Sequence, residues 1–263
     1  MLLSIIIVEY KSLNDINKCI SSIQKKIAVI NKEIIISSNS EYAKVEQEKI
    51  TKLYPHCKWV FNSKNGGFAY AMNRGLKAAK GDYLIIMNPD CIINYGIEDM
   101  LNFLKANPSI GAIAPQIIDF DGNIQDTCRP YVSFNSFIYR QIVRIISNRD
   151  VVLNKKTDYN LTQTTDWIIG AFIMLSRKAY ELTNGLSEEY FMYAEDLDLC
   201  TRIRKSGLEI VYYPKAQITY RGSRSARRCF KYARIFIKSH FIYWNKFGFF
   251  CGYPKRNKII YGK

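Results

Sequence analysis

Acidic side chains lie at two places in the sequence where they could carry chemistry. Asp90 follows an apolar stretch and a proline, and Glu195, Asp196 and Asp198 form the densest acidic cluster, next to aromatic residues. A carboxylate at the end of a strand can hold a divalent cation against a diphosphate. A carboxylate among aromatic side chains has its pKa raised toward the range of a general base. A turn cap at Asp90 and charge matching at a helix start explain the same residues without chemistry.

A pair of glycines marks a third candidate position. Asn65, Gly66, Gly67 and Phe68 follow each other directly. Because glycine has no side chain, the backbone there can approach a ligand closely. An ordinary turn accounts for the pair equally well, so the residues alone leave both explanations open.

Alternating strands and helices must position these side chains. Short apolar runs predict strands over residues 4–8, 33–36, 58–61 and 83–87, and helical spacing predicts helices over residues 13–23 and 68–79. This alternation favours a parallel sheet flanked by helices, in which ligands bind at the carboxyl ends of the strands. The segments after Ser37 and after Met87 are therefore expected to carry chemistry.

The second half of the chain is less regular. Residues 117–165 are polar, with one possible helix over 134–146. A helix is predicted over residues 197–206, and a short strand over 210–213 is predicted to end before Pro214.

Composition bounds the class of protein. The chain has 263 residues, 48% of them hydrophobic, so it can bury a large core. The start of the chain lacks the pattern of a targeting segment, and no apolar run approaches the roughly 18–20 residues of a membrane span. Its seven cysteines are widely spaced, which favours reduced thiols in the cytosol over a disulfide framework or a zinc site.

Positive charge is concentrated at the C-terminal end. From Ile210 to Lys263 there are 13 Lys and Arg residues and no acid, so the first 209 residues hold 25 basic and 23 acidic residues. Such a tail indicates an anionic partner. One stripe at helical spacing is apolar and a second is basic: Phe230, Ala233, Ile237, Phe241 and Trp244, and Arg227, Lys231, Arg234 and Lys238. This pattern predicts a helix on an anionic membrane surface, the alternative being a helix packed on the rest of the protein.

Taken together, the motifs resemble glycosyltransferase family 2, and in particular its rhamnosyltransferase-type members that build bacterial cell-surface polysaccharide. The resemblance covers about residues 3–248. It rests on motifs that follow the family's order and spacing: SIIIV at 4–8, NGGFA at 65–69, GDYLIIMNPD at 81–90, DG at 121–122 with RP at 129–130, DW at 166–167 with GA at 170–171, and YFMYAEDLDLC at 190–200.

The resemblance implies inverting transfer from a nucleotide-diphosphate sugar and assigns roles to residues. Asp90 matches the last acid of the metal-binding motif, and Asp196 matches the general base, with Glu195 beside it. Asp166 and Trp167 match residues near the sugar and acceptor. Residues matched to substrate binding complete the set: Val8, Tyr10, Ser38, Asn65, Gly66, Gly67, Phe68, Asn73, Asn88, Arg129, Gly170 and Asp198.

Two positions depart from the family pattern. The second strand usually ends in an Asp that contacts the pyrimidine base, and Ser38 occupies that place. The last strand is commonly followed by a His that can ligate the metal, and Tyr220 occupies that place. A phenol is a poor ligand for Mg²⁺ or Mn²⁺, so Arg221 or Arg224 is expected to carry part of the phosphate charge.

The sequence thus predicts an α/β protein with the GT-A (Rossmann-like) fold, a mainly parallel central sheet and a basic C-terminal helical extension. We expect a catalytic domain over residues 1–220, with a nucleotide-sugar half (1–115) and an acceptor half (116–220), followed by the extension (221–263). The expected donor is dTDP- or UDP-linked, with dTDP-rhamnose first, and the acceptor is a glycan or a lipid-linked glycan. The expected location is cytoplasmic, at the inner face of the cell membrane.

Two other classes of function, a scaffold subunit and a nucleic-acid binder, are each suggested by part of the sequence. A degenerate transferase acting as a binding or scaffold subunit is suggested by Ser38 and Tyr220, whereas the presence of Asp90 and Asp196 argues against it. A nucleic-acid binder is suggested by charge alone. Because no nucleic-acid motif accompanies the charge, no nucleic-acid partner is expected.

Overall fold

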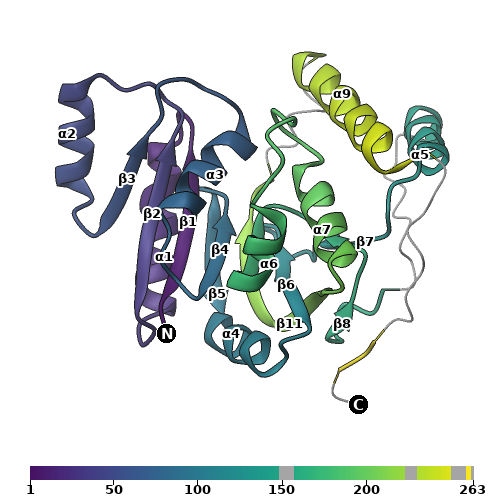
Figure 1. The fold of residues 1–263 in the computed structure, drawn as a ribbon, viewed down its shortest axis with the longest axis horizontal. Coiled ribbons are helices and arrows are strands. Elements are labelled where there is room, and N and C mark those ends of the chain that lie inside the picture. Colours follow the sequence, from purple (N-terminus) through teal and green to yellow (C-terminus); the bar gives the residue numbers. More distant parts are fainter. Residues whose placement is uncertain (148–156, 223–229, 250–258, 262–263) are drawn as a thin grey trace.

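The computed structural model describes residues 1–147, 157–222, 230–249 and 259–261. One large twisted sheet runs through the molecule, and helices cover both of its faces (Figure 1). The α/β class and the mainly parallel sheet predicted from the sequence are confirmed.

Four parallel strands form the N-terminal half of the sheet. They lie in the order β3 (Cys57–Phe61), β2 (Lys32–Ser38), β1 (Leu3–Glu9) and β4 (Tyr83–Met87). The helices that follow the first three strands are α1 (Leu13–Lys26), α2 (Lys44–Leu53) and α3 (Phe68–Ala78). All four strands agree with the sequence prediction, because each is a short apolar run bounded by polar residues.

The sheet continues with strands of mixed direction. β10 (Phe172–Ser176) lies antiparallel between β4 and β6 (Ile110–Ile118), and β11 (Glu209–Tyr220) is parallel to β6. β5 (Cys91–Tyr95) and β8 (Gln163–Thr164) pair with β11, while β7 (Cys128–Arg129) pairs with β9 (Trp167–Ile168) in a small separate sheet. The helices of this half are α4 (Ile97–Ala106), α6 (Arg177–Thr183) and α7 (Glu195–Lys205).

The strand predicted to end before Pro214 is longer than expected. β11 continues to Tyr220, and its register against β6 shifts between Tyr213 and Gln217. Pro214 therefore lies at an irregularity of the strand, where its missing N–H does not interrupt a regular ladder. This extension carries Tyr220 to the position opposite Cys91, one residue after Asp90.

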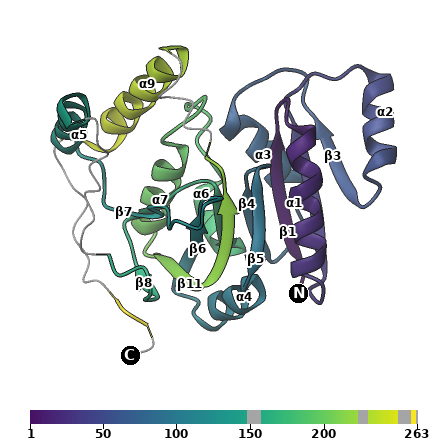
Figure 2. The ribbon, with the colours of Figure 1, turned by 180° about the vertical axis from the view of Figure 1, so that it is seen from behind.

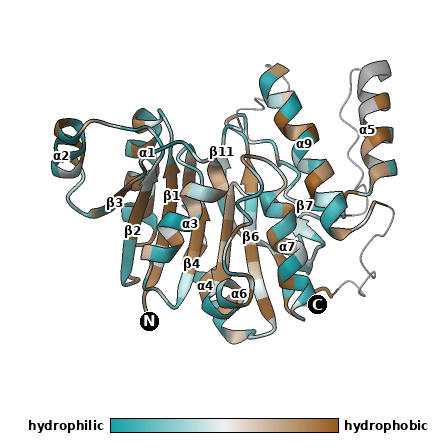
Figure 3. Ribbon diagram, turned by 45° about the horizontal axis from the view of Figure 1, so that its top comes forward, coloured by the Kyte–Doolittle hydropathy of each residue, from teal (hydrophilic) through white to brown (hydrophobic). Residues whose placement is uncertain are grey.

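The core consists of two apolar layers, one on each face of the sheet. Alternate residues of β1 point to opposite layers: Ile5 and Ile7 pack in one, and Ile6 and Val8 in the other. Figure 3 shows these strands as largely hydrophobic ribbons among helices that carry hydrophilic turns. Because both faces of the central strands are covered, these strands read as continuous apolar runs in the sequence.

Two further helices lie at the end of the molecule remote from α2. α5 (Phe134–Ser147) and α9 (Phe230–Phe247) are neighbours in both views (Figures 1 and 2). The predicted C-terminal helix is therefore present, although Arg227 of its basic stripe lies outside the described residues. Among the described helices, none is long and apolar enough to cross a bilayer.

Candidate active site

The acidic cluster lies at the start of α7, after a tight turn. Tyr193 and Ala194 both have positive φ, at 71° and 63°, a conformation that costs energy in residues other than glycine. The turn places Asp196 so that its Oδ2 accepts the Gly170 N–H at 2.8 Å and its Oδ1 accepts the Leu197 N–H at 2.8 Å. Each carboxylate oxygen retains a lone pair for a further donor.

Glu195 differs from its neighbour in environment. It is buried, and its Oε2 has no hydrogen-bond partner among the described residues. Burial, followed by the charge of Asp196, raises the pKa of Glu195 to about 8. Burial also raises the pKa of Asp196, but the backbone donors at Gly170 and Leu197 oppose the shift. The backbone donors therefore favour the ionised form of Asp196, whereas burial without such donors at Oε2 favours the protonated form of Glu195.

Asp90 lies directly after β4 and Pro89. It is partly buried, and burial raises its pKa to about 6, against a smaller lowering by its own backbone hydrogen bond. Asp15 raises this pKa further and Arg221 lowers it. Beside it, Asn88 Nδ2 donates to the Tyr220 hydroxyl at 3.1 Å.

Two hydrogen bonds from backbone N–H groups connect the segment that carries Asp90 with Asp196. The Asn88 N–H donates to the Ala171 carbonyl at 2.9 Å, and the adjacent Gly170 N–H donates to Asp196. Both carboxylates also act electrostatically on Tyr220, whose pKa is raised mainly by burial. The structure thus brings together, at one edge of the sheet, two acids that are 106 positions apart in the sequence.

The same edge offers few ligands for a metal ion. Among the described residues, no three His, Cys, Asp or Glu side chains group as a metal site. Mg²⁺ commonly binds through one or two carboxylates together with substrate phosphates and water. The single carboxylate of Asp90 fits a cation that is held largely by a diphosphate, and it does not form a protein-only metal centre.

Three residues predicted to bind substrate lie on or beside the β7–β9 pair, and β9 contacts α7. Arg129 and Trp167 are directly paired across β7 and β9, with the guanidinium 5.2 Å from the indole centroid. Arg129 also lowers the pKa of Asp196 through its charge. Asp166 accepts from Arg204 Nη1 at 2.6 Å and from the Tyr131 N–H at 3.2 Å. Asp166 is thus fixed by internal partners beside the tryptophan.

The glycine pair closes tightly against the rest of the protein. Gly67 has φ 94°, and a Cβ there would lie 2.2 Å from the Phe191 carbonyl oxygen. Phe68 N–H donates to that same oxygen at 2.8 Å, and Asn65 Oδ1 accepts the Gly67 N–H at 3.1 Å. The loop therefore needs glycine to contact the segment that leads to α7.

The structure changes the interpretation of Ser38. Its hydroxyl donates to Glu9 Oε2 at 2.5 Å and accepts the Ser40 N–H at 3.2 Å. Glu9 pairs directly with Ser38 across β1 and β2, is fully buried, and also accepts from Ser40 and Tyr42. The acid at this edge is thus on β1, between the buried Val8 and the exposed Tyr10. Glu9 was not among the residues predicted from the sequence, although a carboxylate at the end of an apolar strand is a visible signal.

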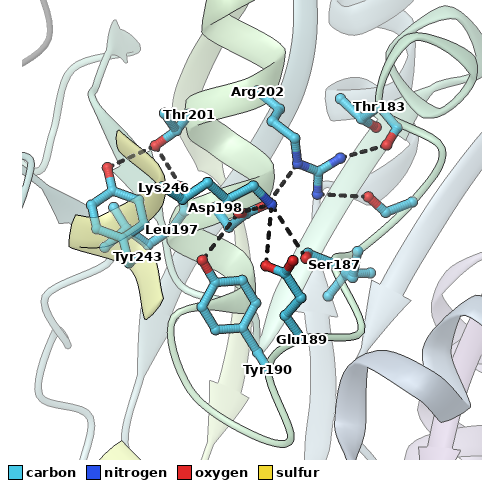
Figure 4. Close-up of polar contacts among 12 residues, drawn as sticks. Thr183, Ser187, Glu189, Tyr190, Leu197, Asp198, Thr201, Arg202, Tyr243 and Lys246 are labelled. Atoms are coloured by element: carbon cyan, nitrogen blue, oxygen red, sulfur yellow. Dashed lines mark hydrogen bonds and ion pairs between the residues drawn. The ribbon is translucent and has the colours of Figure 1, made fainter. Parts of the chain in front are cut away.

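Two predicted substrate-binding residues, Asp198 and Asn73, have polar partners within the protein, and Figure 4 shows those of Asp198. Asp198 is fully buried and accepts from Tyr190, Arg202 and Lys246. Arg202 in turn donates to the Thr183 and Gly185 carbonyls. Asn73 bonds to both the N–H and the carbonyl of Leu186 and to Glu188. These contacts hold the segment between α6 and α7 against α3 and α9.

Comparison with known proteins decides the family. A model described as glycosyl transferase family 2 matches residues 4–183, more than half of the chain. The chain belongs to glycosyl transferase family 2. A second model, described as the N-terminal domain of galactosyltransferase, matches residues 152–223. The first match contains Asp90, and the second contains Asp196.

Relatives of this glycosyltransferase include two rhamnosyltransferases. N-acetylglucosaminyl-diphospho-decaprenol L-rhamnosyltransferase of Mycobacterium tuberculosis is 26% identical over 210 residues, which cover 74% of this chain and 68% of the relative. Rhamnosyltransferase WbbL of Escherichia coli is 26% identical over 187 residues, which cover 69% of this chain and 68% of the relative. The expected rhamnosyltransferase-like resemblance is thus confirmed.

Solved glycosyltransferases share the fold. GalNAc-T7 with UDP, GalNAc and Mn²⁺ superimposes with a TM-score of 0.62 at 14% identity, covering 84% of this chain and 44% of that one. The mannosyltransferase PcManGT of Pyrobaculum calidifontis, with GDP-Man and Mn²⁺, gives 0.59 at 16% identity, covering 93% and 64%. The chain thus spans less than two thirds of either, and at these identities the likeness shows the GT-A fold alone.

Proposed function

We propose that this protein is an inverting glycosyltransferase that moves a sugar from a nucleotide-diphosphate donor to an acceptor hydroxyl. The observation that carries the proposal is that Asp90 and Asp196 lie at one sheet edge, where the segments that carry them are connected through Asn88, Ala171 and Gly170. An acid beside the diphosphate and an ionised base beside the acceptor are the two groups that this reaction needs.

In the proposed step, Asp196 accepts the proton of the attacking hydroxyl. The hydroxyl oxygen bonds to the anomeric carbon as the bond to the diphosphate oxygen breaks on the opposite face, so the anomeric configuration inverts. The Gly170 and Leu197 N–H groups fix the carboxylate for this transfer. Glu195, protonated beside it, leaves the negative charge on Asp196.

Asp90 would hold a divalent cation, Mg²⁺ or Mn²⁺, that offsets the charge developing on the diphosphate. Arg221, which already lowers the pKa of Asp90, is placed to share that charge. Arg224 lies outside the described residues. The bound Mn²⁺ in GalNAc-T7 and PcManGT supports a cation in this fold.

The donor proposed first is dTDP-rhamnose, with UDP-linked sugars next, because the mycobacterial and E. coli relatives are named rhamnosyltransferases. The proposed acceptor is a glycan, free or linked to a lipid diphosphate, as the name of the mycobacterial relative suggests. We propose that residues 1–115 bind the donor, 116–220 the acceptor, and that the basic residues 221–263 hold the enzyme at the inner face of the cell membrane. Ser38, held by its hydrogen bond to Glu9, would then lie near the base of the nucleotide.

A panel of nucleotide sugars, each with and without Mg²⁺ or Mn²⁺, tests the donor by thermal unfolding. A ligand that binds only the native state raises the unfolding temperature by mass action. We expect the largest shift with a dTDP- or UDP-linked sugar plus metal. No shift with any member of the panel would contradict the proposal.

A catalytically degenerate binding subunit is the second candidate. It is favoured by the internal hydrogen bonds of Ser38 and Tyr220 at the two positions that depart from the family. It predicts thermal stabilisation by nucleotide sugars without transfer to any acceptor, whereas the enzyme predicts both.

A further inference from the structure

Two helices expose large apolar side chains at one end of the molecule. On α5 these are Ile138, Tyr139 and Ile142, and on α9 they are Phe230, Ile237 and Phe241. Their exposed fractions range from 39% for Ile138 to 79% for Phe230. Figure 3 shows hydrophobic turns on both helices. We call these six residues the α5/α9 surface.

The two helices have an apolar contact of their own in addition to these exposed side chains. The opposite sides of the two helices pack together through Phe137, which contacts Phe236, His240 and Trp244 at centroid distances of 5.7, 4.9 and 5.1 Å. Trp244 Nε1 also donates to the Val132 carbonyl at 2.8 Å. Of the predicted apolar stripe of α9, Trp244 is buried, whereas Phe230, Ile237 and Phe241 remain exposed.

Charge identifies the kind of partner. Lys231, Arg234 and Lys238 are exposed on α9 beside the apolar residues. Neither the α5 sequence, residues 134–147, nor residues 221–263 contain an Asp or Glu. Cationic and large apolar side chains together suit the interface of an anionic bilayer, where apolar groups enter the acyl boundary and cations meet lipid phosphates.

The surface is connected directly to the turn before α7. Ser239 Oγ on α9 donates to the Met192 carbonyl at 2.8 Å, and the Phe236 ring lies 5.5 Å from that of Tyr193. Tyr193 and Ala194 form the positive-φ turn that places Glu195 and Asp196. A bilayer bound by this surface would therefore lie beside the acceptor side of the site.

We infer that α5 and α9 together form a docking surface for an anionic lipid bilayer. This deepens the proposed function and rests on it for the lipid-linked acceptor, whereas the docking itself can be measured without transfer. Because α5 contributes apolar side chains, binding does not depend on the basic stripe alone. Salt should therefore weaken binding to the bilayer. The contribution of the apolar side chains should remain at 1 M salt, where the Debye length has fallen to about 3 Å.

Co-sedimentation with vesicles tests the surface. The vesicles are phosphatidylcholine alone, or phosphatidylcholine mixed with phosphatidylglycerol. The variants are Ile138→Ser with Ile142→Ser on α5, Phe230→Ser with Ile237→Ser on α9, and Lys231→Gln with Arg234→Gln and Lys238→Gln. Matched controls on the distant α2 (Figure 1) are Val45→Ser with Leu53→Ser, and Lys44→Gln with Lys49→Gln and Lys52→Gln, all of them exposed.

We expect the wild type to bind the anionic vesicles. Each apolar pair should weaken partitioning on the order of tenfold, since inserting even part of a large apolar side chain shifts the equilibrium by about that factor. The basic triple variant should bind more weakly than the wild type at low salt and keep the apolar part of the binding, and the α2 variants should bind as the wild type does. Circular dichroism and stabilisation by a nucleotide sugar confirm that each variant is folded.

Three results would overturn the inference. These are absence of wild-type binding to anionic vesicles, equal loss in the α2 controls, and full binding by the α5 pair. Binding to duplex DNA or RNA at matched salt without vesicle binding would assign the surface to nucleic acid, and a dimer that dissociates in the α5 pair without vesicle binding would assign it to a second copy. Because none of these measurements requires transfer, the docking surface can fail while the proposed reaction stands.

Discussion

At the scale of single residues, Asp196 is the group on which the proposed chemistry depends. Asp196→Asn keeps the shape of the side chain and an acceptor for one of its two backbone donors, but an amide cannot take the hydroxyl proton. We expect transfer to fall by on the order of 10²–10⁴-fold, with donor affinity nearly unchanged. Steady-state transfer rates and nucleotide titration check this. Wild-type turnover by the variant would move the role of base to another acid.

The raised pKa of Glu195 predicts an effect on stability that depends on pH. Its pKa is raised from 4.5 to about 8 in the folded protein, so the folded state binds a proton more tightly than the unfolded chain. Between pH 4.5 and 8 its contribution to stability therefore falls as pH rises. At pH 8, Glu195→Gln should unfold at a higher denaturant concentration than the wild type, because its free energy of unfolding is larger by on the order of 1 kcal/mol or more. Near pH 4.5 the two proteins should differ little in stability.

Urea unfolding at the two pH values measures this difference. Asp121→Asn, an exposed carboxylate remote in sequence from α7, is the matched control and should show no such pH dependence. An equal effect of Glu195→Gln at both pH values would mean that the carboxyl group is ionised in the folded protein.

The position of Asp90 predicts that binding of the metal and binding of the nucleotide depend on each other. Since the described residues hold no protein-only metal site, we expect Mg²⁺ or Mn²⁺ to bind tightly only together with a nucleoside diphosphate. Asp90→Ala should remove most of the metal-dependent gain in nucleotide affinity, on the order of tenfold or more. Calorimetric titration of the nucleotide with and without metal measures this gain. The same gain in wild type and variant would exclude Asp90 from the metal site.

At the scale of elements, α9 is tied to α7 through a buried charge. Lys246 Nζ lies 2.8 Å from Asp198 Oδ2, and Asp198 is fully buried (Figure 4). Lys246→Met leaves Arg202 as the remaining cation, and Lys246 is itself one third exposed. We therefore expect the free energy of unfolding to fall by only about 1–2 kcal/mol.

Chemical denaturation measures that loss, and Lys238→Met serves as the control because Lys238 lies exposed on the same helix. Lys246→Arg should recover most of the stability, since a guanidinium can still reach the carboxylate. Equal losses in the Lys246 and Lys238 variants would show that the contact to Asp198 adds nothing to stability.

Elements were predictable from the sequence where pattern and packing agree. The strand over residues 83–87 was predicted with its observed bounds, because it is an uninterrupted apolar run of which four of the five residues are buried. The strand β11 was predicted to end too early. It continues past Pro214 through a shift in register against β6, and this shift depends on the neighbouring strand. The partners of Asp198 and Asn73 were not predictable either, since Lys246 and Leu186 reach them only through the tertiary fold.

At the scale of the whole molecule, the sequence predicts the class of fold but not the order of the strands. The insertion of β10 between β4 and β6 is set by long-range pairing, which leaves no local signal. That insertion brings Gly170 and Ala171 to Asn88, so that Asp90 and Asp196 lie at the same edge of the sheet. The family resemblance identified both acids, whereas the physical link between them required the structure.

The central claim is inverting transfer from a nucleotide-diphosphate sugar. The most direct test incubates the wild-type protein with dTDP-rhamnose, Mg²⁺ and an N-acetylglucosaminyl diphospholipid, and determines the anomeric configuration of the product by NMR. We expect a rhamnosylated lipid whose new linkage has the configuration opposite to that of the donor, formed on the order of 10²–10⁴-fold more slowly by Asp196→Asn. A product that retains the donor configuration, or one formed equally by the Asp196 variant, would contradict it.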